Sequence, residues 1–105
     1  MIRVSVMYPN QGGKFDMEYY MKQHIPLVHR LLDSYGLVRT EVDKGIGTAE
    51  PGAPAPFVTV AHLVFDSMEN MQKGLGAHDP DLAADLKNFT DIQPQFQISE
   101  MLAQA

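Results

Sequence analysis

The segment from Phe57 to Phe65 constrains the fold of this chain most strongly, because it is apolar on both faces of a predicted strand. Alternate residues of a strand point to opposite faces of the sheet. One face carries four apolar side chains and a threonine, namely Phe57, Thr59, Ala61, Leu63 and Phe65. The other carries three valines and a histidine, namely Val58, Val60, His62 and Val64. A strand of this kind is typical of the centre of a sheet that is covered on both sides.

Three further strands and two helices are predicted around this strand from hydrophobic periodicity and turn residues. The strands are Ile2 to Met7, a more polar edge strand from Leu37 to Ile46, and a last strand from Gln95 to Ser99. The order strand, helix, strand, strand, helix, strand matches the ferredoxin-like βαββαβ arrangement. The sequence therefore predicts an α+β fold with a four-stranded antiparallel sheet, in which the first and third strands are central.

Two helices cover only one face of such a sheet, and the chain has no spare element for the other face. A second copy packed sheet to sheet is the simplest cover, so we expect a homodimer formed through the sheet face. Arg3 and the pair Gln95 and Gln97 are expected on that face as polar groups of the interface.

Composition narrows the class of protein. The net charge is -5 with no basic stripe, which argues against nucleic acid and against an acidic membrane surface as partners. There are no cysteines, so disulfide frameworks and thiolate chemistry are excluded, and a reducing compartment is favoured. No apolar run approaches the roughly 20 residues of a membrane span, and the N-terminus lacks the apolar centre of a signal peptide. A cytoplasmic protein is expected.

The first helix has a distinctive start and interior. Asp16 is a good N-cap, and Tyr20 and His24 are four residues apart and so share one helical face. Pro26 removes a hydrogen bond to the carbonyl of Lys22, which predicts a break in the helix. Gly36 is placed to end it.

The second helix is expected to begin at Asp66 or Ser67. Gly74 and Gly76 loosen it, and Asp79 with Pro80 is expected to restart it as N-cap and first helical residue. The loop from Thr48 to Pro56 is read either as a lid or as a simple connection, and the tail through Ala105 is expected to fray.

The helix motif resembles the opening signature of the EthD family, named for an ethyl tert-butyl ether degradation system. Its residues are Phe15, Asp16, Tyr19, Tyr20, His24, Pro26 and Leu27, with weaker similarity at 4–9, 62–67, 90–94 and 98–99. The resemblance implies one EthD-like domain over residues 1–105 that pairs as a dimeric α+β barrel. Relatives of that fold include cofactor-free monooxygenases, isomerases, cyclases and haem-binding enzymes, so the fold alone does not fix the reaction.

His24, Tyr20 and His62 are the candidate catalytic residues. Imidazole exchanges protons near neutral pH, and a tyrosine hydroxyl beside it can hold a phenolic or enolic oxygen. The alternative for His24 is a structural role, capping the carbonyls that Pro26 frees. His62 is either a core residue or the floor of a pocket between sheet and helices.

Tyr19 and Asp91 are predicted to contact substrate, although an Asx turn is an alternative for Asp91. No metal-ligand spacing is present, so we expect neither metal nor cofactor. The predicted function is acid/base chemistry on an apolar or aromatic oxygenated small molecule, by a cyclase, dehydratase, isomerase or oxidoreductase. The alternative is a non-catalytic accessory or ligand-binding protein of a catabolic pathway.

Overall fold

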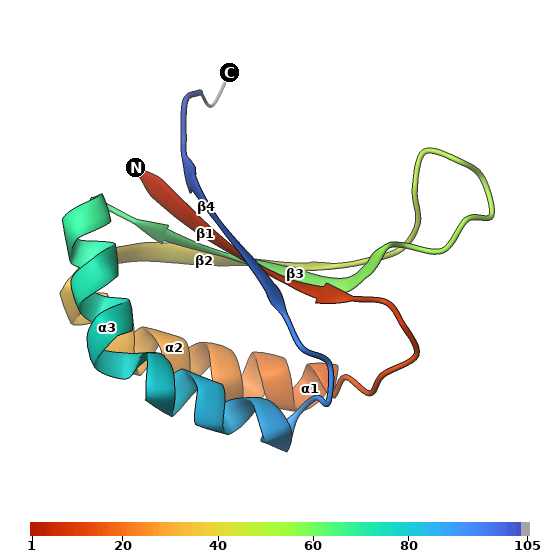
Figure 1. The fold of residues 1–105 in the computed structure, drawn as a ribbon, viewed down its shortest axis with the longest axis horizontal. Helices are drawn as coiled ribbons and strands as arrows, with labels where there is room; N and C mark the ends of the chain where they lie inside the picture. Colours follow the sequence, from red (N-terminus) through yellow and green to blue (C-terminus); the bar gives the residue numbers. More distant parts are fainter. Residues whose placement is uncertain (104–105) are drawn as a thin grey trace.

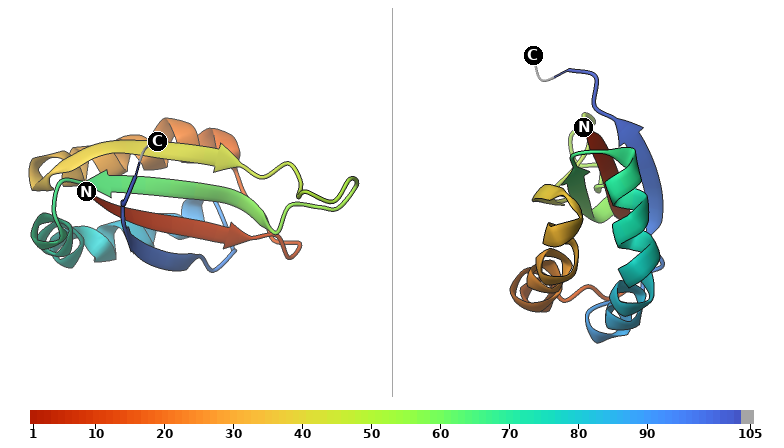
Figure 2. Two further views of the ribbon diagram at one scale, coloured as in Figure 1. Left: turned by 90° about the horizontal axis from the view of Figure 1, so that it is seen from above. Right: turned by 90° about the vertical axis from the view of Figure 1, so that its left-hand side faces the viewer.

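A four-stranded antiparallel sheet with two helical segments on one face makes up the fold (Figure 1). The computed structural model describes residues 1–103, so the expectation for the last two residues of the tail lies outside the described part of the chain. Strand order is β2-β3-β1-β4, which is the ferredoxin-like order, and the predicted α+β fold class is confirmed. The two helical segments lie side by side beneath the sheet, and its other face is open (Figure 2).

The strands agree closely with the predicted segments. They are β1 (Ile2–Pro9), β2 (Leu37–Lys44), β3 (Phe57–Phe65) and β4 (Gln95–Glu100). β1 lies between β3 and β4 and pairs antiparallel with both, so β1 and β3 are the central strands as predicted. The register places Val4 opposite Leu63 and Ser5 opposite His62, which sets apolar residues toward the helices and polar residues toward the open face.

The first helical segment is not broken at Pro26, contrary to the prediction. It runs through α1 (Met17–Tyr19), the π-helical turn η1 (Tyr20–His24), α2 (Ile25–Leu32) and the 3-10 turn η2 (Asp33–Tyr35). The N–H of Ile25 donates to the carbonyl of Tyr20, five residues back, so one extra residue is inserted just before the proline. The π-turn therefore compensates for the hydrogen bond that Pro26 cannot donate, and the chain stays helical.

Both ends of this segment follow the sequence prediction. The side chain of Asp16 accepts a hydrogen bond from the backbone N–H of Tyr19 at 3.0 Å, as an N-cap does. Gly36 ends the segment in the left-handed region at φ 78°. A Cβ built on Gly36 would overlap a carboxylate oxygen of Asp66, so both the backbone and the space require glycine there.

The second helix also differs from its prediction. α3 (Met68–Asp85) is one helix with Pro80 inside it, and Asp79 is not an N-cap. Ser67 caps the start, accepting from the N–H of Asn70, and the 3-10 turn η3 (Leu86–Asn88) follows the end. α3 bends along its length in Figure 1, as expected where a proline withholds a helical hydrogen bond.

The core lies between the helices and the sheet. Leu32 and Phe65 are fully buried, and Val4, Val28 and Met71 pack in the same cluster. The loop from β2 to β3 projects beyond the end of the sheet and away from the helices, so it does not cover the helix side (Figure 1). No helix within residues 1–103 is long and apolar enough to cross a membrane. A cytoplasmic location stays a prediction, since it rests on composition.

Candidate functional site

A cavity of about 120 Å³ lies between the helices and the sheet. Its wall is mostly aliphatic, with Val4 and Leu63 from the sheet and Leu82 and Leu86 from the second helical segment. Four polar or titratable side chains interrupt that wall, namely Tyr8, Tyr20, His24 and Asp79. An apolar cavity with a few converging polar groups is the usual form of a small-molecule site.

His24 is held at this cavity by the π-turn and by a side chain from the far end of α3. Its Nδ1 lies 2.8 Å from Oδ2 of Asp85, and the histidine is only 7% exposed. Its ring stacks on the ring of Tyr20 with centroids 5.3 Å apart and tilts against Phe89 at 4.7 Å. The partner of His24 is thus a carboxylate rather than freed backbone carbonyls, which was the structural alternative.

Three donors converge on the carboxylate of Asp85. Tyr19 donates its hydroxyl to Oδ1 at 2.7 Å, Asn88 donates its amide to Oδ1 at 2.8 Å, and His24 meets Oδ2. Burial alone would raise the pKa of Asp85, but these hydrogen bonds outweigh it and lower the pKa below its ordinary value. The hydrogen bond to Asp85 in turn raises the pKa of Tyr19.

The lowered pKa of Asp85 fixes the form of His24. An ionised carboxylate only accepts hydrogen bonds, so Nδ1 of His24 carries the proton that it donates. In the neutral ring the other nitrogen, Nε2, is then the basic one. Nε2 has no hydrogen-bond partner among residues 1–103, and His24 lines the cavity.

Two buried tyrosines complete the polar lining. Tyr8 is 1% exposed and Tyr20 is 2% exposed, and their rings meet edge to face at 5.9 Å. Burial raises the pKa of Tyr8 to about 12, with a smaller opposing effect from the hydroxyl of Tyr20. Burial also raises the pKa of Tyr20 strongly. Both hydroxyls therefore stay protonated at neutral pH and remain hydrogen-bond donors.

The remaining predicted site residues lie elsewhere. The hydroxyl of Tyr19 is directed to Asp85, so this residue supports His24 rather than lining the cavity. Asp91 accepts a hydrogen bond from the backbone N–H of Lys14 at 2.8 Å and lies beside a shallow hollow near Phe15. Asp91 therefore holds the backbone just before the first helical segment, and it lies outside the cavity of His24.

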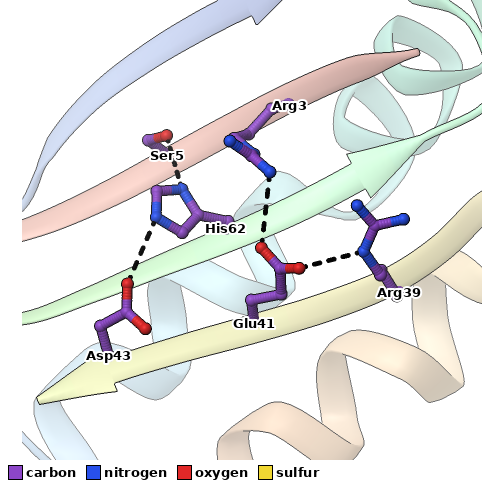
Figure 3. A network of polar contacts seen from close by, with 6 residues as sticks. All are labelled: Arg3, Ser5, Arg39, Glu41, Asp43 and His62. Atoms are coloured by element: carbon purple, nitrogen blue, oxygen red, sulfur yellow. Dashed lines mark hydrogen bonds and ion pairs between the residues drawn. The ribbon is translucent and has the colours of Figure 1, made fainter. Parts of the chain in front are cut away.

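The structure does not bring His62 to His24. His62 points to the open face, where its Nδ1 lies 2.9 Å from Oγ of Ser5 and its Nε2 lies 3.6 Å from Asp43 (Figure 3). The expectation that His62 forms the floor of a pocket under the helices is therefore not met, because alternate residues of β3 face opposite ways. Leu63, the next residue, lines the cavity instead.

The open face carries a second polar group around Glu41. This carboxylate pairs with Arg3 at 3.5 Å and with Arg39 at 3.1 Å (Figure 3). The hydrogen bond from Arg39 lowers the pKa of Glu41. The predicted apolar character of this face thus holds along β3, through Val58, Val60 and Val64, while β1 and β2 present polar groups beside it.

Asp85 and Tyr8 are site residues that sequence reasoning did not find. Asp85 is 61 positions from His24, so no local spacing connects the two. One signal was present, since a carboxylate in the last turn of a helix is unfavourable with the helix dipole and needs a compensating partner. Tyr8 lies one residue beyond the predicted strand from Ile2 to Met7, whereas β1 extends through it.

Among residues 1–103, no group of three or more histidine, aspartate or glutamate side chains is arranged to hold a metal ion. The histidines His24, His62 and His78 belong to different parts of the molecule. His78 pairs with Asp81 on α3, and the other two histidines face opposite sides of the sheet.

Fold and cavity together define a ferredoxin-like α+β protein with a histidine-lined apolar pocket. The EthD domain family matches residues 12–93 of this chain, and the chain belongs to that family. The expected resemblance is confirmed.

Solved structures agree with the fold, and the first of them also with the family. An EthD-like protein from Ralstonia eutropha JMP134 is 36% identical, covers 99% of this chain and 94% of its own, and superposes with a TM-score of 0.92. An EthD family protein from Bacillus halodurans C-125 is 20% identical, with 97% and 99% covered and a TM-score of 0.76. A dimeric ferredoxin-like protein from an uncultured marine organism is 14% identical, with 100% and 98% covered and a TM-score of 0.57. No functionally curated protein matches the sequence.

Proposed function

We propose that this chain, as one domain over residues 1–105, is a small-molecule enzyme in which His24 moves a proton. The observation that carries the proposal is the position of His24 at an apolar cavity, with Nδ1 fixed by Asp85 and Nε2 unpaired among the described residues. A histidine held in one tautomer by a carboxylate is a general base whose free nitrogen points at the reacting molecule.

The substrate that fits is a neutral, apolar or aromatic molecule. It loses a proton either from a hydroxyl group or from a carbon atom next to an oxygen-bearing carbon. Nε2 of His24 takes that proton, and the hydroxyl of Tyr8, which accepts from the hydroxyl of Tyr20, donates to the oxygen on which negative charge develops. The aliphatic wall lowers the local dielectric constant, which strengthens these interactions. Enolisation-driven cyclisation, dehydration, isomerisation or oxygenation of an activated ring all begin with such a step, and the proposed chemistry needs no cofactor for it.

A test needs no knowledge of the natural substrate. 5-Nitrobenzisoxazole is a neutral aromatic molecule that opens when a base removes its ring C–H proton, breaking the N–O bond to give a coloured phenolate. The wild-type chain should accelerate this reaction, and His24→Gln should lower the rate by about a hundredfold or more, the usual contribution of a positioned base. Asp85→Asn should also lower the rate, because it removes the group that fixes the tautomer of His24.

The control is His78→Gln, which alters a histidine outside the cavity and should keep the wild-type rate. Equal rates for His24→Gln and the wild type would contradict the proposal. A loss in His62→Gln as large as that in His24→Gln would assign the base to the open face instead. Binding of the probe without acceleration would favour the accessory, ligand-binding function.

We also propose that the protein is a homodimer that packs through the open sheet face. Val58 and Val60 of β3 are partly exposed there and offer an apolar strip, and Arg3, Glu41 and His62 offer polar partners around it. Association of ferredoxin-like proteins as dimers, as in the marine relative, supports this arrangement.

A further inference from the structure

The cavity at His24 is too small to contain a typical substrate. Its volume is about 120 Å³. An apolar cavity of about 150 Å³ holds one benzene-sized molecule, whereas ligand pockets usually measure roughly 300–1,000 Å³. A single small ring therefore fills the space beside His24, and any larger molecule must extend out of it.

A second hollow provides the direction for that extension. A groove of about 720 Å³ runs between α3 and β4, and it shares wall residues such as Val4, Leu86, Pro94 and Phe96 with the cavity. α3 and β4 lie along the same side of the molecule in both views of Figure 2. The groove is thus continuous with the cavity and leads from His24 to solvent.

The groove is built to take an apolar chain. On the strand side, Phe96 is 61% exposed and Ile98 is 51% exposed, and the register sets both on the helix side of the sheet. On the helix side, Gly76 and Ala83 leave space, since a Cβ on Gly76 would meet nothing within 4 Å. Large exposed apolar side chains along a trough of small residues mark a binding surface.

The charge around the groove narrows the class of ligand further. Asp79 lines both the cavity and the groove, and the chain as a whole carries a net charge of -5. An acidic group on the extended part of a ligand would therefore meet repulsion at this rim.

Building on the proposed function, we propose that the substrate is elongated, with an oxygenated ring at His24 and a neutral apolar tail in the groove between α3 and β4. The occupant of the groove is thus the tail of the same molecule that reacts in the cavity. Phe96, Ile98 and the small residues of α3 then set the length of tail that the enzyme prefers.

Binding of 4-alkylphenols, from phenol to 4-hexylphenol, measured by calorimetry tests this inference. In the wild type, affinity should rise about two- to fourfold with each added methylene, the upper value being that of full burial. Gly76→Leu should flatten this rise, because the leucine occupies the groove and lies on the helix without strain. The matched control is Ala77→Leu, an exposed residue of α3 outside the groove, which should keep the wild-type slope. A tail ending in a carboxylate should bind severalfold more weakly than the alkyl tail of equal length.

The outcomes separate this inference from the proposed function. If phenol binds but affinity does not grow with chain length, or if Gly76→Leu keeps the wild-type slope, the groove does not hold the tail. If the carboxylate tail binds as well as the alkyl tail, the tail is not required to be neutral. If the groove instead holds a second copy, Gly76→Leu changes the sedimentation mass and leaves the slope intact. If not even phenol binds, the proposed function falls together with this inference.

Discussion

At the scale of single residues, the site is a chain of hydrogen bonds that ends in a free nitrogen. Asn88 and Tyr19 hold one oxygen of Asp85, the other oxygen holds Nδ1 of His24, and Nε2 of His24 is left for the cavity. Each donor that Asp85 receives stabilises its ionised form, and that form determines which nitrogen of His24 is basic. The catalytic proposal therefore depends on a carboxylate that touches no substrate.

Tyr8 gives a prediction about alkaline stability. The fold holds its hydroxyl neutral up to a pKa of about 12, whereas an unfolded tyrosine ionises near pH 10. The stability linked to Tyr8 is thus fully present below about pH 10 and is lost as the pH rises from there toward 12. The loss should reach about 3 kcal/mol for this residue, at about 1.36 kcal/mol for each pKa unit.

Denaturant unfolding at about pH 8 and about pH 11.5 checks this expectation. Tyr8→Phe should lower the free energy of unfolding at the lower pH. It should also show a smaller decrease in this free energy between the two pH values. Part of the decrease should remain, because the buried Tyr20 is still present. Tyr35→Phe alters a tyrosine outside this cluster and should leave the fall unchanged. A fall of the same size in Tyr8→Phe and the wild type would contradict the assignment.

At the scale of elements, the sequence predicted which segments form and mispredicted how two prolines are accommodated. Alternation located the strands, and the caps Asp16 and Gly36 were read correctly, because these signals are local. The effects of Pro26 and Pro80 were overestimated, since burial of both helices against the sheet outweighs one missing hydrogen bond in each. The pairing of His24 with Asp85 could not be predicted from the sequence, because it depends on where the end of α3 meets the first helical segment.

Two glycines of α3 give an element-scale prediction with opposite signs. A Cβ on Gly74 would lie 2.8 Å from Cβ of Tyr35, whereas one on Gly76 would meet nothing within 4 Å. Gly76→Ala should raise the free energy of unfolding by about 0.5–1 kcal/mol through helix propensity alone. Gly74→Ala should lower it by about 1–2 kcal/mol, because the overpacking against η2 exceeds that gain.

Thermal or denaturant unfolding of the two variants measures both effects. Each serves as the control for the other, since the substitution and the helix are the same. Stabilisation by Gly74→Ala would show that α3 and η2 do not approach as closely as described.

At the scale of the whole molecule, the sheet separates two environments. The helix side is apolar and holds the cavity of His24. The open side holds the polar groups around Glu41 and His62 (Figure 3), with the valines of β3 on the same face. The sequence predicted the uncovered face because β3 is apolar on both sides. It did not predict the polar network, because ion pairs across strands depend on register.

The proposed dimer is tested at this scale by sedimentation at micromolar concentration. The wild type should have the mass of two chains, and Val60→Lys, which places a charge in the middle of the open face, should yield one. Met21→Lys changes an exposed apolar residue of the helical layer and should keep the dimer. A monomeric wild type would refute the arrangement, and a circular dichroism melt separates lost association from lost folding.

The alternation of β1 and β3 also bears on how this family can diversify. Val4 lines the cavity, and its neighbour Ser5 meets His62 on the open face, so positions of the cavity and of the open face are interleaved along the same strands. Substitution can therefore change one environment and spare the other. Insertion or deletion of a single residue within either strand exchanges the two faces at once. Length variation among descendants of such a chain should accordingly fall in the projecting β2 to β3 loop, while the central strands change only in composition.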